Sequence, residues 1–118
     1  MKVAVVGGGT SGEAMKRALQ AAGAQATLHS RRTGFDVLRD DAAAELSGAD
    51  AIVEATGRFT TSRRVATEFF TRSTRAVSAA ANTLGARHVL LSIVGCDLPQ
   101  VQGYGYFAGK SAQERIAR

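Results

Sequence analysis

Short apolar runs alternate with longer amphipathic segments along the whole chain. The apolar runs cover residues 3–6, 24–29, 51–55 and 89–94. Between them, apolar side chains recur at helical spacing, most clearly over residues 12–22 and 62–84. Strands that alternate with helices are typical of βαβ units, whose strands join one parallel sheet. The pattern therefore predicts an α/β protein with a doubly wound parallel sheet of about five strands in three layers, α/β/α.

Glycines mark three junctions between a predicted helix and the next strand. Gly23, Gly48 and Gly85 each follow a helical pattern and precede an apolar run. Glycine adopts the left-handed conformation that often ends a helix without a steric cost. Two shorter elements are also expected, an edge strand over residues 35–38 and a helix over residues 42–46. Two aspartates precede that helix, and aspartate is a favourable N-cap residue.

The first apolar run leads directly into a glycine-rich turn. Gly7, Gly9 and Gly12 form a Gly-x-Gly-x-x-Gly motif between a predicted strand and a predicted helix. Glycine permits a tight turn there and lets the backbone approach a pyrophosphate, which binds the free N–H groups of the helix N-terminus. In this context the motif predicts a Rossmann-type dinucleotide site that includes Thr10 and Ser11. A glycine loop without a ligand is the alternative.

The end of the second predicted strand carries arginines where this fold usually has an acid. NAD-binding members place Asp or Glu about 20 residues beyond the glycines, against the ribose 2′-hydroxyl. Here the residues are Ser30, Arg31 and Arg32. A guanidinium binds a 2′-phosphate through two hydrogen bonds, whereas a carboxylate would repel it. We expect the cofactor to be NADP(H), with NADPH preferred over NADH. A solvated turn is the alternative.

A second turn of small residues follows the run at residues 51–55. Thr56 and Gly57 come directly after it, at the carboxyl edge of the sheet, where open α/β sheets bind their ligands. We expect both residues to contact the cofactor, as well as Asp36 of the short edge strand. For Thr56 and Gly57 a plain turn is the alternative.

Composition restricts the class of protein. The 118 residues suffice for one domain, residues 1–118, and 45% hydrophobic with 21% charged residues is ordinary for a globular protein. No apolar run reaches the roughly 20 residues of a membrane span. Cys96, the single cysteine, cannot form an internal disulfide, and no signal peptide precedes the first strand. The expected location is the cytoplasm. No cluster of residues has metal-ligand spacing.

The chain is basic, with a formal charge of +5 and a pI of about 10.1. Its arginines are spread along the chain, with pairs at Arg31–Arg32 and Arg63–Arg64, and aromatic residues do not alternate with them. A nucleic-acid surface needs a clustered basic patch, usually with stacking aromatic residues. The charge therefore suits an anionic cofactor better than a nucleic acid.

Three residues in the last third of the chain are candidates for chemistry. Tyr106 and Lys110 are four residues apart, so on a helix they share a face. An ammonium about 4 Å away, at an effective dielectric constant of about 20, favours a tyrosinate by roughly 4 kcal/mol. Lys110 would thus lower the pKa of Tyr106 and make it a better base. Ser92 lies in the run at residues 89–94, close to the same edge of the sheet.

These segments resemble the NmrA-like, atypical branch of the short-chain dehydrogenases/reductases. The similar segments are residues 1–12, 30–34, 68–71, 91–95 and 106–114. The most specific are Ser-Ile-Val-Gly from residue 92 and Tyr-x-x-x-Lys-x-x-x-Glu from residue 106. The resemblance implies a Rossmann fold, NADP(H), and hydride transfer to or from a carbonyl, alcohol or quinone-like substrate. It also implies that Ser92 positions the substrate carbonyl, that Tyr106 transfers the proton, and that Lys110 holds the nicotinamide ribose.

The sequence departs from the family in three ways. Its glycine turn is one residue shorter than the Gly-x-x-Gly-x-x-Gly common in the family, and Gly109 lies inside the active-site helix, where it costs about 1 kcal/mol relative to alanine. Family members also continue for about as much chain again, so the chain resembles their N-terminal half and looks truncated. Without a later strand, residues 89–94 would form an exposed apolar edge through which the chain could self-associate.

The sequence thus predicts the NADP(H)-binding domain of a short-chain-type oxidoreductase that acts on a small molecule. One alternative is a non-catalytic NADP(H) sensor that acts through a protein partner, and another is an interaction module that binds no nucleotide. The complete set of Ser92, Tyr106 and Lys110 favours the enzyme, whereas the short length favours the alternatives, because the isolated chain would lack a substrate pocket.

Overall fold

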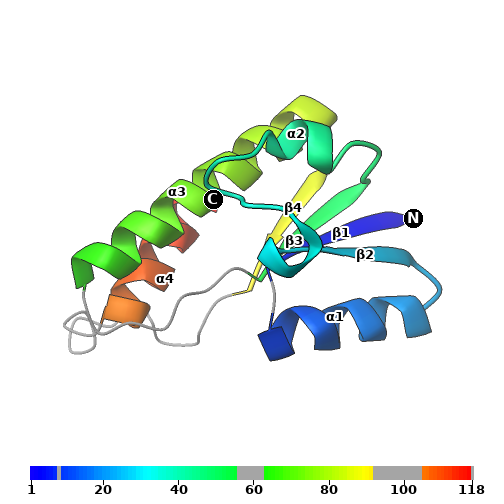
Figure 1. Cartoon of the computed structure of the whole chain (residues 1–118), viewed down its shortest axis with the longest axis horizontal. Coiled ribbons are helices and arrows are strands. Elements are labelled where there is room, and N and C mark those ends of the chain that lie inside the picture. The colour runs from blue at the N-terminus through cyan, green and yellow to red at the C-terminus, as the bar shows by residue number, and fades with distance from the viewer. Residues whose placement is uncertain (8, 56–62, 92–104, 118) are drawn as a thin grey trace.

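In the part of the chain that the structure describes, four parallel strands form one sheet in the order β2-β1-β3-β4 (Figure 1). The computed structural model describes residues 1–7, 9–55, 63–91 and 105–117. The elements in chain order are β1 (Lys2–Val6), α1 (Gly9–Ala21), β2 (Gln25–His29), the 3-10 helix η1 (Arg31–Thr33), α2 (Ala42–Glu45), β3 (Ala51–Glu54), α3 (Arg63–Leu84), β4 (Arg87–Leu90) and α4 (Gly105–Ala117).

The central strand β1 is almost completely buried. It pairs with β2 on one side and with β3 on the other, and its residues Val3, Ala4, Val5 and Val6 are all buried. A parallel strand that is covered on both faces has no solvent-exposed side, which explains its continuous apolar run. The chain passes outward from β1 to β2 and then returns across β1 to β3. The order of the strands therefore reverses at the carboxyl ends of β1 and β3, where ligands bind in this architecture.

Helices cover both faces of the sheet. Figure 1 shows α1 on one face and α2, α3 and α4 on the other, with α3 and α4 side by side. Every second residue of the strands points to the face that α2 and α3 cover. The apolar cluster there joins Ala4, Val6 and Ile52 of the strands to Leu46 and Val77. The predicted three-layer, doubly wound parallel α/β fold is confirmed.

The apolar pattern of the longest helix predicts a buried stripe at helical spacing, formed by Val65, Phe69, Val77, Ala80 and Leu84. The structure confirms the second half of this stripe and shifts the first. Val77 and Ala80 of α3 are buried, as expected. In the first half, Phe70 is fully buried and Phe69 is only half-buried. Successive residues of a helix point in directions 100° apart. The face that α4 and β3 cover in this half of the helix therefore carries Phe70 in place of Phe69.

The short edge strand predicted over residues 35–38 is wrong. Residues 37–39 form a turn, and the Asp36 carboxylate accepts a hydrogen bond from the backbone N–H of Leu38 (N–Oδ1 3.0 Å). Aspartate often bonds the backbone two residues on in this way, which favours a turn over a strand. Phe35 is nevertheless buried, in the core under α2. The described residues therefore contain four strands, one fewer than the sequence predicts.

The other predicted elements are present, with small shifts. Helix α2 covers residues 42–45, and its N-cap Asp41 accepts from the N–H of Ala44. The φ angles of Gly23, Gly48 and Gly85 are all positive, as predicted for glycines that end helices. Strand β4 begins at Arg87, before the apolar run at residues 89–94, and residues 92–94 lie outside the described residues.

Strand β4 lies at an edge of the described sheet. It pairs with β3 alone among the described strands, and Val89 on its open face is 52% exposed. Its exposed and half-buried residues alternate, because one face packs on α3 and α4 while the other faces away from them. The apolar run identified only its second half, because the first half consists of the exposed Arg87 and of His88, which is polar although it packs inward and bonds to Glu54. None of the described helices has the length and apolar character of a membrane span.

Candidate functional site

Each glycine of the motif has a backbone reason in the structure. Gly7 and Gly9 have φ angles of 118° and 79°, a region that side-chain-bearing residues rarely adopt. A Cβ on Gly12 would collide with the carbonyl oxygen of Gly7 and lie 3.3 Å from the Leu28 side chain. Helix α1 begins at Gly9, so the turn ends at a helix N-terminus. The motif is therefore the tight strand-to-helix turn that the sequence predicts.

Space is open on the outer side of this turn. A Cβ built on Gly9 would meet no heavy atom of the described residues within 4 Å. The first N–H groups of a helix have no partner within the helix and carry partial positive charge, so they favour an anion beside them. Ser11 in the first turn of α1 is exposed, whereas the side chain of Thr10 lies outside the described part.

The turn lies next to the end of β2. The backbone N–H of Gly7 donates to the carbonyl oxygen of His29, with an N–O distance of 2.9 Å. Ser30 follows as the N-cap of η1, and Arg31 and Arg32 lie in that helix with exposed side chains. The structure therefore brings the two predicted cofactor segments together, one from each of two neighbouring strands.

Ser30 is the most buried of these polar residues, at 7% exposure. Its hydroxyl oxygen has no hydrogen-bond partner among the described residues. The η1 backbone is held instead by Thr33, whose hydroxyl accepts from the Ser30 N–H and donates to the Ser30 carbonyl, both at 2.9 Å. A buried polar atom without a partner is unfavourable by about 1–3 kcal/mol, so a ligand atom at this position would be stabilising.

Of the remaining predicted site residues, the structure describes the side chain of Asp36 but not those of Ser92, Thr56, Gly57 and Tyr106. Asp36 contacts its own turn, where its carboxylate bonds the Leu38 N–H and lies 3.9 Å from Arg39 Nε. Ser92, Thr56 and Gly57 lie outside the described residues. Tyr106 lies in the first turn of α4, and its side chain is not among those described.

Lys110 is the one predicted catalytic residue whose side chain the structure describes. It is 2% exposed, and its Nζ donates to the carbonyl oxygen of Leu91 at 3.1 Å. The same Nζ lies 4.7 Å from the centre of the Phe70 ring, within the range of a cation–π contact. Leu91 directly follows β4 and precedes Ser92 in the chain. The ammonium group therefore lies at the carboxyl end of β4, on the edge predicted for the reaction.

Sequence reasoning missed the most heavily bonded polar side chain of the sheet, Glu54. It is the last residue of β3, is completely buried, and contacts polar side chains of α3, β4 and α4. Its partner on β4 is His88, which is half-buried. The sequence does contain one signal that could have identified Glu54, because it is a charged residue in the otherwise apolar run at residues 51–55.

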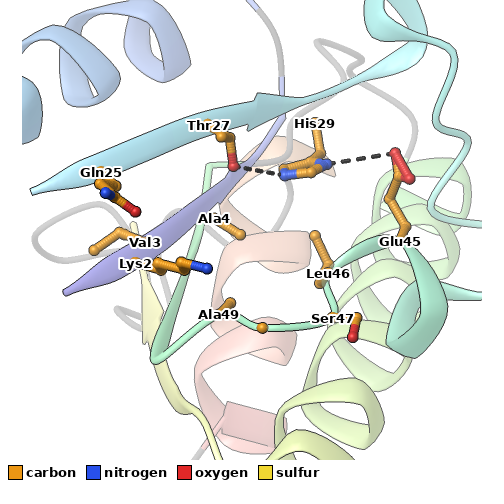
Figure 2. A pocket seen from close by; sticks show the side chains of 11 residues that line it. Lys2, Val3, Ala4, Gln25, Thr27, His29, Glu45, Leu46, Ser47 and Ala49 are labelled. Atoms are coloured by element: carbon orange, nitrogen blue, oxygen red, sulfur yellow. Dashed lines mark hydrogen bonds and ion pairs between the residues drawn. The ribbon is translucent and has the colours of Figure 1, made fainter.

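A pocket of about 310 Å³ lies elsewhere, on the sheet face that carries α2 (Figure 2). Ala4 and Leu46 contribute apolar surface to it, and His29 lies at one end. The two ring nitrogens of His29 are already paired, Nε2 with Thr27 Oγ1 at 2.8 Å and Nδ1 with Glu45 Oε1 at 3.4 Å. The pocket is separated from the glycine turn and α1 by the sheet, so it is distinct from the candidate cofactor site.

The part of the chain that the structure describes contains no candidate metal centre. No three or more His, Cys, Asp or Glu side chains gather in a possible metal site within the described ranges.

No protein-family model matches the sequence, and no curated protein is similar to it. Solved structures share its fold. The oxidoreductase ylbE from Lactococcus lactis has a TM-score of 0.79 and 20% identity over 97% of this chain. A short-chain dehydrogenase/reductase superfamily protein from Agrobacterium tumefaciens, solved with bound NAD, has a TM-score of 0.79 and 19% identity over 98%. A protein from Lactobacillus casei has a TM-score of 0.72 and 17% identity over 98%.

Because these sequence identities are only 17–20%, the similarity shows a shared fold and nothing more. The chain has the parallel Rossmann-like α/β fold of these proteins, among them an oxidoreductase and an NAD-bound short-chain dehydrogenase/reductase superfamily member. It spans 61% of the Lactococcus chain, 44% of the Agrobacterium chain and 65% of the Lactobacillus chain.

Proposed function

We propose that the chain is the NADP(H)-binding domain of an oxidoreductase of the NmrA-like, atypical short-chain type. The main support for this proposal is that the glycine turn at the N-terminus of α1 lies next to the Ser30-Arg31-Arg32 segment at the end of β2. A dinucleotide needs both features, one for its pyrophosphate and one for its adenosine ribose. The Agrobacterium protein, which has the same fold, was solved with bound NAD.

The residues present fit NADP(H). The open space at Gly9 leaves room for a pyrophosphate beside the first N–H groups of α1. The unpartnered Ser30 hydroxyl and the exposed Arg31 and Arg32 guanidinium groups suit the 2′-phosphate, and η1 has no acid in its first turn. Neither guanidinium forms an ion pair with a described carboxylate.

The chain's own residues would supply orientation and a proton. The bound cofactor provides the hydride that a carbonyl, alcohol or quinone-like substrate gains or loses. Tyr106 would transfer the proton to or from the substrate oxygen, and Ser92 would hold that oxygen by a hydrogen bond. Lys110, one helical turn after Tyr106, would favour the tyrosinate and hold the ribose hydroxyls. In the structure its Nζ is bonded to the Leu91 carbonyl, at the carboxyl end of β4.

A role as an NADP(H) sensor is the second candidate. The chain spans 44–65% of the length of the three solved chains. The apolar side chain of Val89 on β4 is also exposed, which a protein partner could cover. A sensor would bind the cofactor at the same site but would pass the signal to a protein partner. Turnover by the chain extended with the second half of a family member separates the two candidates, because only the enzyme then oxidises NADPH when a substrate is added.

Cofactor choice tests the proposal directly. We expect the chain to bind NADPH more tightly than NADH, because charge-assisted bonds to the 2′-phosphate contribute about 1.5–3 kcal/mol, or roughly tenfold or more in affinity. Replacing Arg31 and Arg32 together by alanine should remove most of this preference. Titration of each nucleotide by calorimetry measures both dissociation constants.

The matched control for this double variant replaces Arg72 and Arg75 by alanine. These arginines are also exposed but lie on α3, away from the glycine turn. We expect this control to keep the preference for NADPH although its net charge falls equally. Equal dissociation constants for NADPH and NADH in the unaltered chain would contradict the proposed cofactor.

A further inference from the structure

The buried carboxylate of Glu54 lies where four elements meet. Its Oε2 accepts hydrogen bonds from Ser73 Oγ (3.2 Å) and Thr74 Oγ1 (2.8 Å) of α3. The same oxygen accepts from Gln113 Nε2 of α4 at 3.1 Å. The other oxygen, Oε1, lies 2.9 Å from His88 Nε2 of β4. One side chain at the end of β3 therefore joins α3, β4 and α4.

This arrangement restricts where the helices can lie. Glu54 is 0% exposed, and a buried carboxylate is costly by several kcal/mol unless hydrogen bonds replace its water. A carboxylate only accepts, so its neighbours must present N–H or O–H groups. Ser73, Thr74 and Gln113 do so, and all three are themselves 0% exposed. A rotation of α4 about its axis would remove the Gln113 donor and leave the charge less satisfied.

Glu54 is also linked to Lys110 through the backbone. The carbonyl oxygen of Glu54 accepts from the N–H of Leu91 at 2.9 Å. The carbonyl oxygen of Leu91 accepts in turn from Lys110 Nζ at 3.1 Å. On α4, Lys110 and Gln113 are three residues apart, so they lie on the same face of the helix. Glu54 therefore holds the Lys110 region from two sides, through Leu91 and through Gln113.

We propose that Glu54 is a positioning residue for α4. Through Gln113 it sets the rotation and depth of the helix, and it thereby holds the Lys110 ammonium group at the carboxyl end of β4. Its importance for catalysis rests on the proposed function, in which Lys110 takes part in the reaction. Glu54 acts through α4 and makes no contact with substrate.

The chemical accessibility of Lys110 tests this role without any cofactor. The chain has three lysines, and Lys2 is exposed and serves as an internal reference. Under native conditions an amine-acetylating reagent should modify Lys110 far more slowly than Lys2, as measured by quantitative mass spectrometry. In Gln113→Met, which keeps the side-chain length but removes the donor, we expect Lys110 to react about tenfold faster or more.

A matched control separates positioning from general stability. Leu46 is buried under α2, in the apolar cluster and away from α4, and Leu46→Ala costs about 2–5 kcal/mol in stability. We expect this variant to leave the Lys110 rate, relative to Lys2, close to that of the unaltered chain. A second variant, Gln113→Glu, places a second carboxylate beside that of Glu54, and the two negative charges repel each other. This variant should expose Lys110 at least as much as Gln113→Met does.

Two results would overturn the proposal. One is a Lys110 rate that stays unchanged in both Gln113 variants. The other is an equal rise in Leu46→Ala, which would show that Glu54 stabilises the protein without positioning α4. The NADPH titration gives an independent result, because labelling requires no cofactor. A failure of NADPH binding with the expected labelling would reject the proposed function and leave the positioning role of Glu54 intact.

Discussion

Replacing Gly9 by valine is expected to abolish NADPH binding while the protein stays folded. The space beside Gly9 is open among the described residues, none of which has a heavy atom within 4 Å of a Cβ built there. A branched side chain there would occupy the volume that we assign to the pyrophosphate. We expect the affinity for NADPH to fall by about 100-fold or more, which corresponds to roughly 2.7 kcal/mol. Calorimetric titration measures the affinity, and circular dichroism checks the fold.

The control must reproduce the backbone strain of this variant, because Gly9 has a φ of 79°. Gly23 has a φ of 92°, also has open space around it, and ends α1 at the opposite edge of the sheet. Each substitution should lower the stability by about 1–2 kcal/mol through the left-handed conformation. Only Gly9→Val should lose the cofactor. Normal NADPH binding by folded Gly9→Val would place the cofactor elsewhere and reject the central proposal.

The second large effect is expected from Tyr106→Phe. If Tyr106 transfers the proton, its loss should lower kcat by about 10²–10⁴-fold, the usual contribution of general acid–base catalysis. The affinity for NADPH should stay unchanged, because the phenol is not part of the glycine turn or of the Ser30-Arg31-Arg32 segment. The measurement is NADPH oxidation, followed by absorbance, with a panel of quinones, aldehydes and ketones. It uses the chain extended by the second half of a family member, which would supply the substrate pocket.

Tyr104, the only other tyrosine of the chain, provides the control. Tyr104→Phe should keep its activity, since the proposed mechanism gives it no role. Turnover that is insensitive to Tyr106→Phe would contradict the assigned proton donor. Binding of NADPH without turnover of any substrate by the extended protein would contradict the enzymatic proposal and favour the NADP(H) sensor.

The predicted cofactor segments illustrate what local sequence can specify. Gly7, Gly9 and Gly12 are required by the turn itself, so a motif of adjacent residues was sufficient to predict its conformation. The meeting of this turn with Ser30 was also predictable, because consecutive βαβ strands lie side by side in a parallel sheet. That the buried Ser30 hydroxyl has no hydrogen-bond partner among the described residues was not predictable, since it depends on the burial that η1 and β2 create together.

Glu54 shows where sequence reasoning fails for the candidate site. Its partners Ser73, Thr74 and Gln113 are 19, 20 and 59 residues away in the chain. Each of the three is an ordinary polar residue on a helix, and no local pattern indicates that it faces a carboxylate. The same holds for Lys110, whose helix position suggested a role beside Tyr106 but not its bond to Leu91.

The sequence by itself determined the α/β class, the turn at Gly7, the length of α3 and the glycines that end the helices. These features depend on residues within a few positions of one another, through apolar periodicity and backbone conformation. Only the tertiary structure decided that residues 35–38 turn away from the sheet, that β4 lies at its edge, and that Glu54 and Lys110 are buried. Those outcomes depend on long-range packing, because burial and hydrogen-bond partners come from segments that are distant in the chain.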